Sequence, residues 1–130
     1  MPSMPRSDLT PYQTPSGYVS WDCEWAGVNV GYEKSTQPID ATEKFSLLPG
    51  GGCLCPHWGY VLKGKSTYVF DDHEEVYEAG EFFYLPPGHR PKHEAGTEWI
   101  CFSPAEEHKR TQSLSRHRQD AGSAEVSALG

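Results

Sequence analysis

The second half of the chain consists of short runs of β-forming residues, each of them ended by Gly, Pro or a polar turn. Strands that recur at such short and regular intervals are typical of a β-sandwich or a β-barrel. Neither an internal repeat nor a long helical periodicity competes with this interpretation. We therefore expect an all-β domain. The expected strands are residues 57–62, 66–70, 74–77, 81–85 and 97–103, together with two short strands within 17–32 that are joined by a turn near Ala26-Gly27.

Length and composition agree with one small β domain. The chain has 130 residues, of which 13 are Gly and 11 are Pro, and this favours many turns over a helical bundle. The formal net charge is −7, and an acidic surface repels the phosphates of nucleic acids, so we expect no nucleic-acid partner. No run reaches the roughly 20 apolar residues that span a membrane, so we expect no membrane partner either.

The first 13 residues are polar and Pro-rich and lack the apolar core of a signal peptide. We therefore expect a cytoplasmic protein, in which thiols stay reduced. The chain has four Cys residues, and in that compartment cysteines are more often packed, catalytic or metal-bound than linked in disulfides.

The chain divides into three regions by composition. Residues 1–16 are rich in Pro, Ser and Thr and are expected to form a flexible N-terminal arm. Residues 17–104 contain the expected strands and form the barrel. Residues 105–130 are polar and mixed in charge, so we expect a mobile C-terminal tail with at most a short basic helix over 110–118.

Cys53, Cys55 and His57 alternate along the chain after a Gly-rich loop. If this stretch is extended, the three side chains lie on one face. Thiolate and imidazole are ligands that zinc prefers, and other late transition metals also accept them. A structural zinc finger would need a second Cys or His pair at finger spacing, and the sequence has none. The alternation therefore predicts part of a metal site whose other ligands come from elsewhere in the fold.

His89 and His93 are the candidates for those ligands, because they share one face of an extended segment. Two separate segments that each present ligands on one face suit a metal site at the centre of a barrel. Such a site can keep one position open for substrate or water. Two alternatives remain: the cysteines pack as small hydrophobic residues, or Cys53 and Cys55 form a strained or redox-active pair.

Three further residues are candidates for catalysis. Asp40 precedes the Gly-rich loop and is either a ligand, a general base or a turn cap. Tyr60 and Tyr84 lie on expected strands and would line a pocket if they face the interior, since inward and outward positions alternate along a barrel strand. Cys101 is expected to pack. Three other histidines are expected on the surface, namely His73, His108 and His117.

Two segments resemble the sequence motifs of cupins. Residues 57–64, His-Trp-Gly-Tyr-Val-Leu-Lys-Gly, resemble the end of the first motif, which finishes in a Val-Leu-x-Gly turn. Residues 80–88 match the start of the second motif, which is a Gly, five residues and then Pro-x-Gly. The chain is therefore similar to small single-domain cupins of the RmlC-like superfamily, over 50–104 and more weakly from residue 17. The resemblance implies a double-stranded β-helix, or jelly-roll barrel, and a homodimer.

The first motif departs from the usual cupin ligands. His57 stands seven positions before Gly64, where a cupin usually has a Glu. The two His residues that usually precede that Glu are absent, and Cys53 and Cys55 lie nearby instead. The chain thus resembles an atypical branch of small bacterial cupins with the signature Cys-x-Cys-Pro-His-Trp-Gly-Tyr.

The second motif departs as well. Pro91 stands where a cupin usually has its last His, and His89 and His93 flank that position by two residues on either side. Both therefore keep its face of the strand. An iron or manganese dioxygenase site would favour His and carboxylate ligands, whereas thiolates favour zinc.

These observations lead to one main functional hypothesis and three alternatives. The main one is an enzyme in which a divalent metal ion, zinc by preference, acts as a Lewis acid on a small polar metabolite, in an isomerisation, elimination, cyclisation or condensation. The first alternative is an iron-dependent oxygenase. The second is a non-catalytic cupin that binds a small ligand as a sensor or accessory subunit. The third is a metal-free dimer in which Cys and His only pack.

Overall fold

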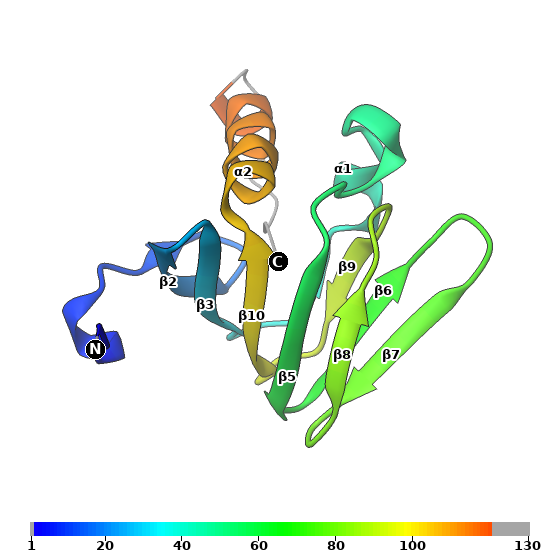
Figure 1. Cartoon of the computed structure of the whole chain (residues 1–130). Helices are drawn as coiled ribbons and strands as arrows, with labels where there is room; N and C mark the ends of the chain where they lie inside the picture. Colours follow the sequence, from blue (N-terminus) through cyan, green and yellow to red (C-terminus); the bar gives the residue numbers. More distant parts are fainter. Residues whose placement is uncertain (1, 121–130) are drawn as a thin grey trace.

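The computed structural model describes residues 2–120, with side chains up to residue 113. Its strands form two antiparallel sheets around a common interior (Figure 1). The larger sheet has six strands in the order β1-β2-β3-β10-β5-β8. Their bounds are β1 Tyr12–Gln13, β2 Tyr18–Trp25, β3 Val28–Ser35, β10 Glu98–Pro104, β5 His57–Lys63 and β8 Phe82–Leu85.

The smaller sheet has four strands in the order β4-β9-β6-β7. Their bounds are β4 Ile39–Asp40, β9 Arg90–His93, β6 Lys65–Val69 and β7 Glu74–Glu78. The helical elements are η1 Arg6–Asp8, α1 Thr42–Ser46, η2 Pro49–Gly51 and α2 Ala105–Asp120. In Figure 1, α1 and α2 stand at the same end of the two sheets, and we call this end the barrel mouth.

The all-β prediction is confirmed, and so are the five strands expected after residue 56, which are β5, β6, β7, β8 and β10. The sequence did not predict β9, because its four residues include Pro91, which cannot donate a ladder hydrogen bond. β9 nevertheless pairs with β4 and β6. It carries Pro91 and His93 on its buried face, so it belongs to the barrel wall.

The interior is filled by residues that alternate along the strands. Val61 on β5, Leu85 on β8 and Trp99 on β10 are almost fully buried, while their neighbours along each strand face outward. Phe45 of α1 is 1% exposed and closes the core from the side of the short helix. Alternation therefore separates an inner from an outer face on β5, β8 and β10.

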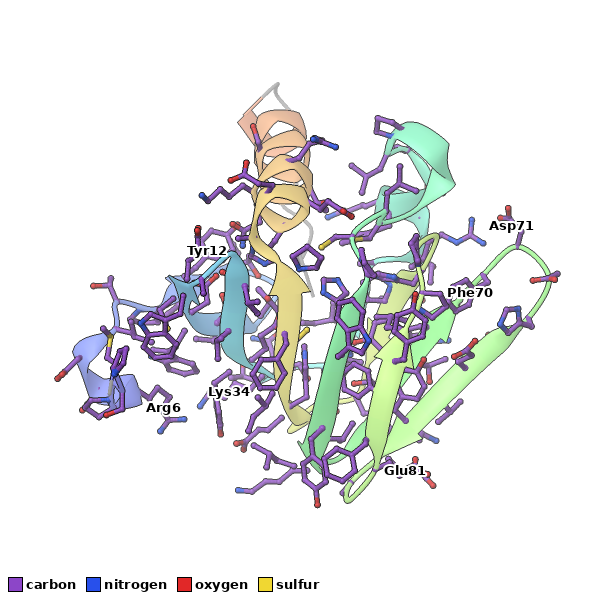
Figure 2. The ribbon with its side chains drawn as sticks, in the orientation of Figure 1. Arg6, Tyr12, Lys34, Phe70, Asp71 and Glu81 are labelled. Carbon is purple, nitrogen blue, oxygen red and sulfur yellow. The ribbon has the colours of Figure 1, made fainter. Side chains whose placement is uncertain are left out.

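The N-terminal segment, which was expected to be a flexible arm, contains η1 and β1. β1 pairs with β2 in the register Tyr12↔Ser20. Arg6, labelled in Figure 2, holds its guanidinium carbon 4.8 Å from the ring centre of Trp21 and 4.6 Å from that of Tyr32. Cation–π contacts of this kind stabilise a segment that has little apolar side chain of its own.

The region after Pro104 contains the helix α2 over residues 105–120, which is longer than the short helix considered over 110–118. The helix is anchored where Ala105 is buried and its N–H donates to the carbonyl of Gly27 at 2.9 Å. Lys109 forms an ion pair of 2.8 Å with Glu24. Residues 121–130, the rest of the expected tail, lie outside the described residues. Within residues 2–120, no helix is both long and apolar enough to cross a membrane.

Two glycines flank Cys101 on neighbouring strands. Cys101 is the register partner of Gly31 on β3 and of Gly59 on β5. A Cβ on Gly59 would lie 2.1 Å from the carbonyl oxygen of Ile100 and 2.5 Å from the ring of Phe83, whereas a Cβ on Gly31 would meet nothing closer than 3.7 Å. The close approach of β5 to β10 and β8 thus requires glycine at 59 only.

We predict that Gly59→Ala lowers the free energy of unfolding by about 1–3 kcal/mol, the usual cost of overpacking a filled interior. Gly31→Ala is the matched control and should be neutral or slightly stabilising, because Gly weakens a strand that has room for a side chain. Urea unfolding of both variants measures the difference. Equal losses of stability in the two variants would contradict the close packing of β5.

A candidate metal centre inside the barrel

Three side chains from the two predicted segments converge at one point. The ligand atoms of Cys53, His57 and His89 all lie within 4.8 Å of one another. Cys53 Sγ is 3.9 Å from His57 Nε2. In a tetrahedral zinc site, sulfur and nitrogen ligands lie about 3.5 Å apart, so small side-chain movements would complete the geometry. This group could hold a metal ion.

Backbone hydrogen bonds bring the two segments together. Cys53 N–H donates to the carbonyl of His89 at 2.9 Å, and Gly88 N–H donates to the carbonyl of Cys53 at 2.7 Å. A Cβ on Gly52 would lie 2.7 Å from the carbonyl oxygen of Gly88, so this approach needs glycine at 52. His57 enters the site as the first residue of β5.

The two histidines of the group are oriented by their outer ring nitrogens. His57 Nδ1 lies 2.6 Å from Ser103 Oγ, and His89 Nδ1 lies 2.9 Å from the carbonyl oxygen of Pro86. Because a carbonyl only accepts, His89 Nδ1 carries the proton and Nε2 is left with a bare lone pair. That Nε2 is buried and has no hydrogen-bond partner among the described residues. An outer hydrogen bond that fixes the ring and frees Nε2 is the usual arrangement of a metal-bound histidine.

Burial keeps the group uncharged in the absence of a cation. It lowers the pKa of His89 to about 4 and holds the pKa of His57 well below its ordinary value, with the neighbouring His89 adding to the second effect. Burial also raises the pKa of the Cys53 thiol to about 11. A metal ion binds the thiolate and neutral imidazoles, so the histidines are already in the binding form and Cys53 would release a proton.

The other two predicted ligands, Cys55 and His93, are not members of this group. Cys55 is 1% exposed and lines the same cavity, but its Sγ lies 3.5 Å from the carbonyl of Pro56. The assumption of one continuous strand is wrong here, because β5 begins only at His57. His93 faces the interior, yet its ring stacks on Trp99 at 4.4 Å.

None of the three residues considered for catalysis reaches the interior. Asp40 is exposed, and its Oδ1 accepts hydrogen bonds from the N–H and the hydroxyl of Thr42, the first residue of α1, at 3.1 and 2.6 Å. Tyr60 and Tyr84 occupy outward positions of β5 and β8, since inward positions are taken by their strand neighbours. The sequence predicted that side chains alternate between two faces along these strands, but it did not show which face is the inner one.

Of the three histidines that were expected on the surface, one is confirmed there. His73 is exposed, with its ring between Asp72 and Glu75. His108 instead lines the interior cavity, because α2 turns this side chain toward the barrel mouth. The side chain of His117 lies outside the described residues.

A cavity of about 30 Å³ extends from Cys53 and His57 to the wall formed by β2, β3 and β10. α2 closes one side of it with His108, Thr111 and Gln112. The inner face of β2 and β3 contributes polar side chains to this cavity. They are Ser20, Asp22, Asn29 and Glu33.

Glu33 is the functional candidate that the sequence did not reveal. Its carboxylate accepts hydrogen bonds from the hydroxyl of Tyr18 and, at 3.1 Å, from Trp99 Nε1. Burial raises the pKa of Glu33 to about 7, and Asp22 adds to the rise, while the hydrogen bond from Tyr18 opposes it. A carboxyl group that titrates near neutrality inside a cavity is suited to proton transfer. Glu33 differs from a surface Glu only because it lies on the inward face of β3. The sequence alone does not show which face of this strand is inward.

Comparison with known proteins identifies the fold through structures rather than sequence. No protein-family model matches the chain, and no curated protein matches it. An RmlC-like cupin from Shewanella frigidimarina NCIMB 400 superposes with a TM-score of 0.55 at 17% identity, over 78% of this chain and 88% of that one. The polyketide cyclase RemF from Streptomyces resistomycificus gives a TM-score of 0.53 at 15% identity, over 81% and 80%. Pac13 from Streptomyces, a nucleoside dehydratase, gives 0.56 at 9%, over 81% and 82%. The chain therefore has the small cupin fold.

We predict that the metal-free protein loses stability as the pH falls from 6.5 to 4.5. The unfolded chain then protonates its histidines, whereas the folded state keeps His57, His89 and His93 neutral, since burial also lowers the pKa of His93 to about 3. Glu33 reduces this loss of stability, because the folded state binds a proton at Glu33 that the unfolded chain releases. Near pH 5, where the unfolded histidines are almost fully protonated, the net difference reaches about two protons and the slope about 2.7 kcal/mol per pH unit.

Urea unfolding at several pH values, with a chelator present, measures this slope. His93→Gln removes one of the three buried histidines and should reduce the slope by about 1.4 kcal/mol per pH unit. A stability that stays constant or rises over this range would show that the histidines are accessible to protons in the folded state.

Proposed function

We propose that this cupin-fold protein is an enzyme that uses a divalent metal ion, with zinc favoured, on a small polar metabolite. The observation that carries the proposal is the convergence of Cys53, His57 and His89 around the unpartnered Nε2 of a fully buried His89. Two proteins of the same fold, RemF and Pac13, are named as a cyclase and a dehydratase. These are reactions of the type that we propose for this chain.

Three protein ligands suit a catalytic rather than a structural site. Structural zinc sites have four protein ligands, whereas catalytic sites use three and leave a position for water or substrate. The bound metal would supply Lewis-acid polarisation of an oxygen atom. Ser103 and the Pro86 carbonyl keep His57 and His89 in orientation. A thiolate among the ligands favours zinc over the iron of an oxygenase.

Glu33 supplies the second chemical group of the proposal. Isomerisation, elimination and cyclisation each require that a proton leave or join the substrate, and Glu33 lines the same cavity as Cys53 and His57. Tyr18 and Trp99 hold its carboxylate in place. Because its pKa is about 7, the group can accept and return a proton near neutral pH.

The size of the cavity bears on how a metabolite would enter it. A volume of about 30 Å³ accommodates only one or two water molecules, so a metabolite enters when the α2 side chains His108, Thr111 and Gln112 move away.

The four cysteines are free thiols, which supports a reducing, cytoplasmic location. The working unit in this proposal is a homodimer, as the cupin resemblance implies.

We predict that the purified protein binds about one zinc ion per chain. Cys53→Ser, His57→Gln and His89→Gln should each weaken zinc binding at least tenfold, because each substitution removes the sulfur or the imidazole nitrogen that binds the metal. Cys101→Ser and His93→Gln are matched controls from the same interior and should bind zinc like the parent. Elemental analysis and competition with a chromophoric chelator measure both quantities.

Two outcomes of that experiment would contradict the proposal. Stoichiometric iron without zinc would favour an oxygenase. If Cys53→Ser and His57→Gln bound metal like the parent, the metal would bind elsewhere, and the interior would be packed and metal-free.

We predict that Glu33→Gln keeps the zinc ion but loses turnover. The amide retains the shape of the side chain and can still accept from Trp99, yet it cannot accept a proton from substrate. Incubation of zinc-loaded parent, Glu33→Gln and His57→Gln with a metabolite mixture, followed by mass spectrometry, identifies compounds that only the parent converts. The expected loss is at least a hundredfold. Ligands that bind the parent unchanged, with no conversion, would favour a sensor or accessory role.

A further inference from the structure

A second cavity lies at the barrel mouth, where α2 faces the segment 48–54 that follows α1 (Figure 1). We call this cavity the mouth pocket. Its volume of about 80 Å³ exceeds the 30 Å³ of the interior cavity. Because one water molecule needs roughly 10–15 Å³ of such space, the mouth pocket has room for a small organic molecule.

One side of the mouth pocket is apolar. It is lined by Leu48, Pro49 and Leu54. Leu48 is buried, whereas Leu54 is 50% exposed. Removing an exposed leucine side chain from water is favourable, so this side of the pocket suits an apolar group of a ligand.

The opposite side, on α2, carries two charges of opposite sign. Glu107 and Arg110 line the pocket there, together with Thr111. At the same three-residue spacing on α2, Glu106 and Lys109 form an ion pair of 3.7 Å. Glu107 and Arg110 form no ion pair among the side chains that the structure describes. Both charges are therefore available to a ligand.

The spacing of Glu107 and Arg110 limits which ligand can reach both. Side chains three residues apart on a helix begin about 5–6 Å from one another at Cβ. A ligand that pairs with both must therefore hold its own cation and anion close together. An α-amino acid does so, because its ammonium and carboxylate groups share one carbon. Arg binds a carboxylate through two parallel N–H donors, and the carboxylate of Glu accepts from an ammonium group.

The mouth pocket adjoins the metal-binding group. Thr111 lines both this pocket and the interior cavity. Gly52 also lines the mouth pocket and directly precedes Cys53 in the chain. A ligand in the mouth pocket therefore lies beside a residue that could hold the metal, and not on a remote surface.

We infer that the mouth pocket binds an α-amino acid with an apolar side chain. Arg110 pairs with its carboxylate and Glu107 with its ammonium group, while the three apolar residues of the pocket contact its side chain. A pocket with an apolar wall and a few charged groups that fix orientation is typical of small-molecule sites. As a statement about the substrate class of the enzyme, this inference rests on the proposed function.

Calorimetric titration of the zinc-loaded protein with leucine and three analogues tests this inference. Leucine should bind. Isocaproate lacks the ammonium group and isoamylamine lacks the carboxylate, so each should bind at least tenfold more weakly, because one charged group of the pocket then has no partner. The isomer 6-aminohexanoate carries its two charges at opposite ends and should bind at least tenfold more weakly as well. An analogue that binds as tightly as leucine would contradict the inference.

Two variants assign each charge of the pocket to its group on the ligand. Arg110→Gln should bind leucine and isoamylamine alike, whereas Glu107→Gln should bind leucine and isocaproate alike. Damage to the fold would weaken all probes and would not produce these paired changes. Glu106→Gln and Lys92→Gln make the same changes of charge outside the pocket and should bind leucine like the parent. Equal losses in Glu106→Gln and Glu107→Gln would overturn the inference.

Measuring zinc and leucine separately keeps the two proposals distinct. His57→Gln, freed of zinc, should still bind leucine, because His57 does not line the mouth pocket. A parent that binds zinc but not leucine would overturn this inference and leave the metal centre intact. A parent that binds leucine but no zinc would support the amino-acid site and overturn the proposed metal-dependent enzyme.

Discussion

The two hydrogen bonds between Cys53 and the segment Gly88–His89 are the constraint on which the interior chemistry depends. They join two parts of the chain separated by the whole of β5 to β8, and they do so at distances of 2.7 and 2.9 Å. Gly52 permits the approach because a Cβ would meet the Gly88 carbonyl. Without this bridge, Cys53 and His89 would belong to two separate loops. With it, their side chains meet His57 at the barrel mouth.

The sequence predicted the strands well where turn residues separate them. Gly, Pro or, between β6 and β7, the polar turn 71–73 separate the segments from 57 to 104, and the conformational preferences of these residues end strands at defined points. β9 was not predicted because Pro91 is unfavourable in a strand, and only pairing with β4 and β6 overrides that preference. For α2, the sequence suggested at most a short basic helix over 110–118, because the segment lacks an apolar stripe. Its placement depends on contacts with Gly27 and Glu24, which are distant in sequence.

The site was predictable in residue type and less so in geometry. The types at 53, 57 and 89 followed from ligand chemistry, and the structure brings these three together. Cys55 was included by extending strand alternation into a segment that is not a strand. Glu33 was missed because periodicity shows that two faces exist but not which of them is inner. That decision is made by the partner strands, since β3 pairs with β2 and β10 across the wall.

The alternation along β5 ties the interior chemistry to the register of this one strand. His57 belongs to the metal-binding group, and the next residue, Trp58, lies on the outer side of the sheet and is 47% exposed. A strand has a period of two, so a slip of β5 by one residue against β8 and β10 would exchange the two faces. The indole would then enter the cavity and the imidazole would face solvent. The pairing of β5 with its two neighbours therefore decides which of the two rings the cavity receives.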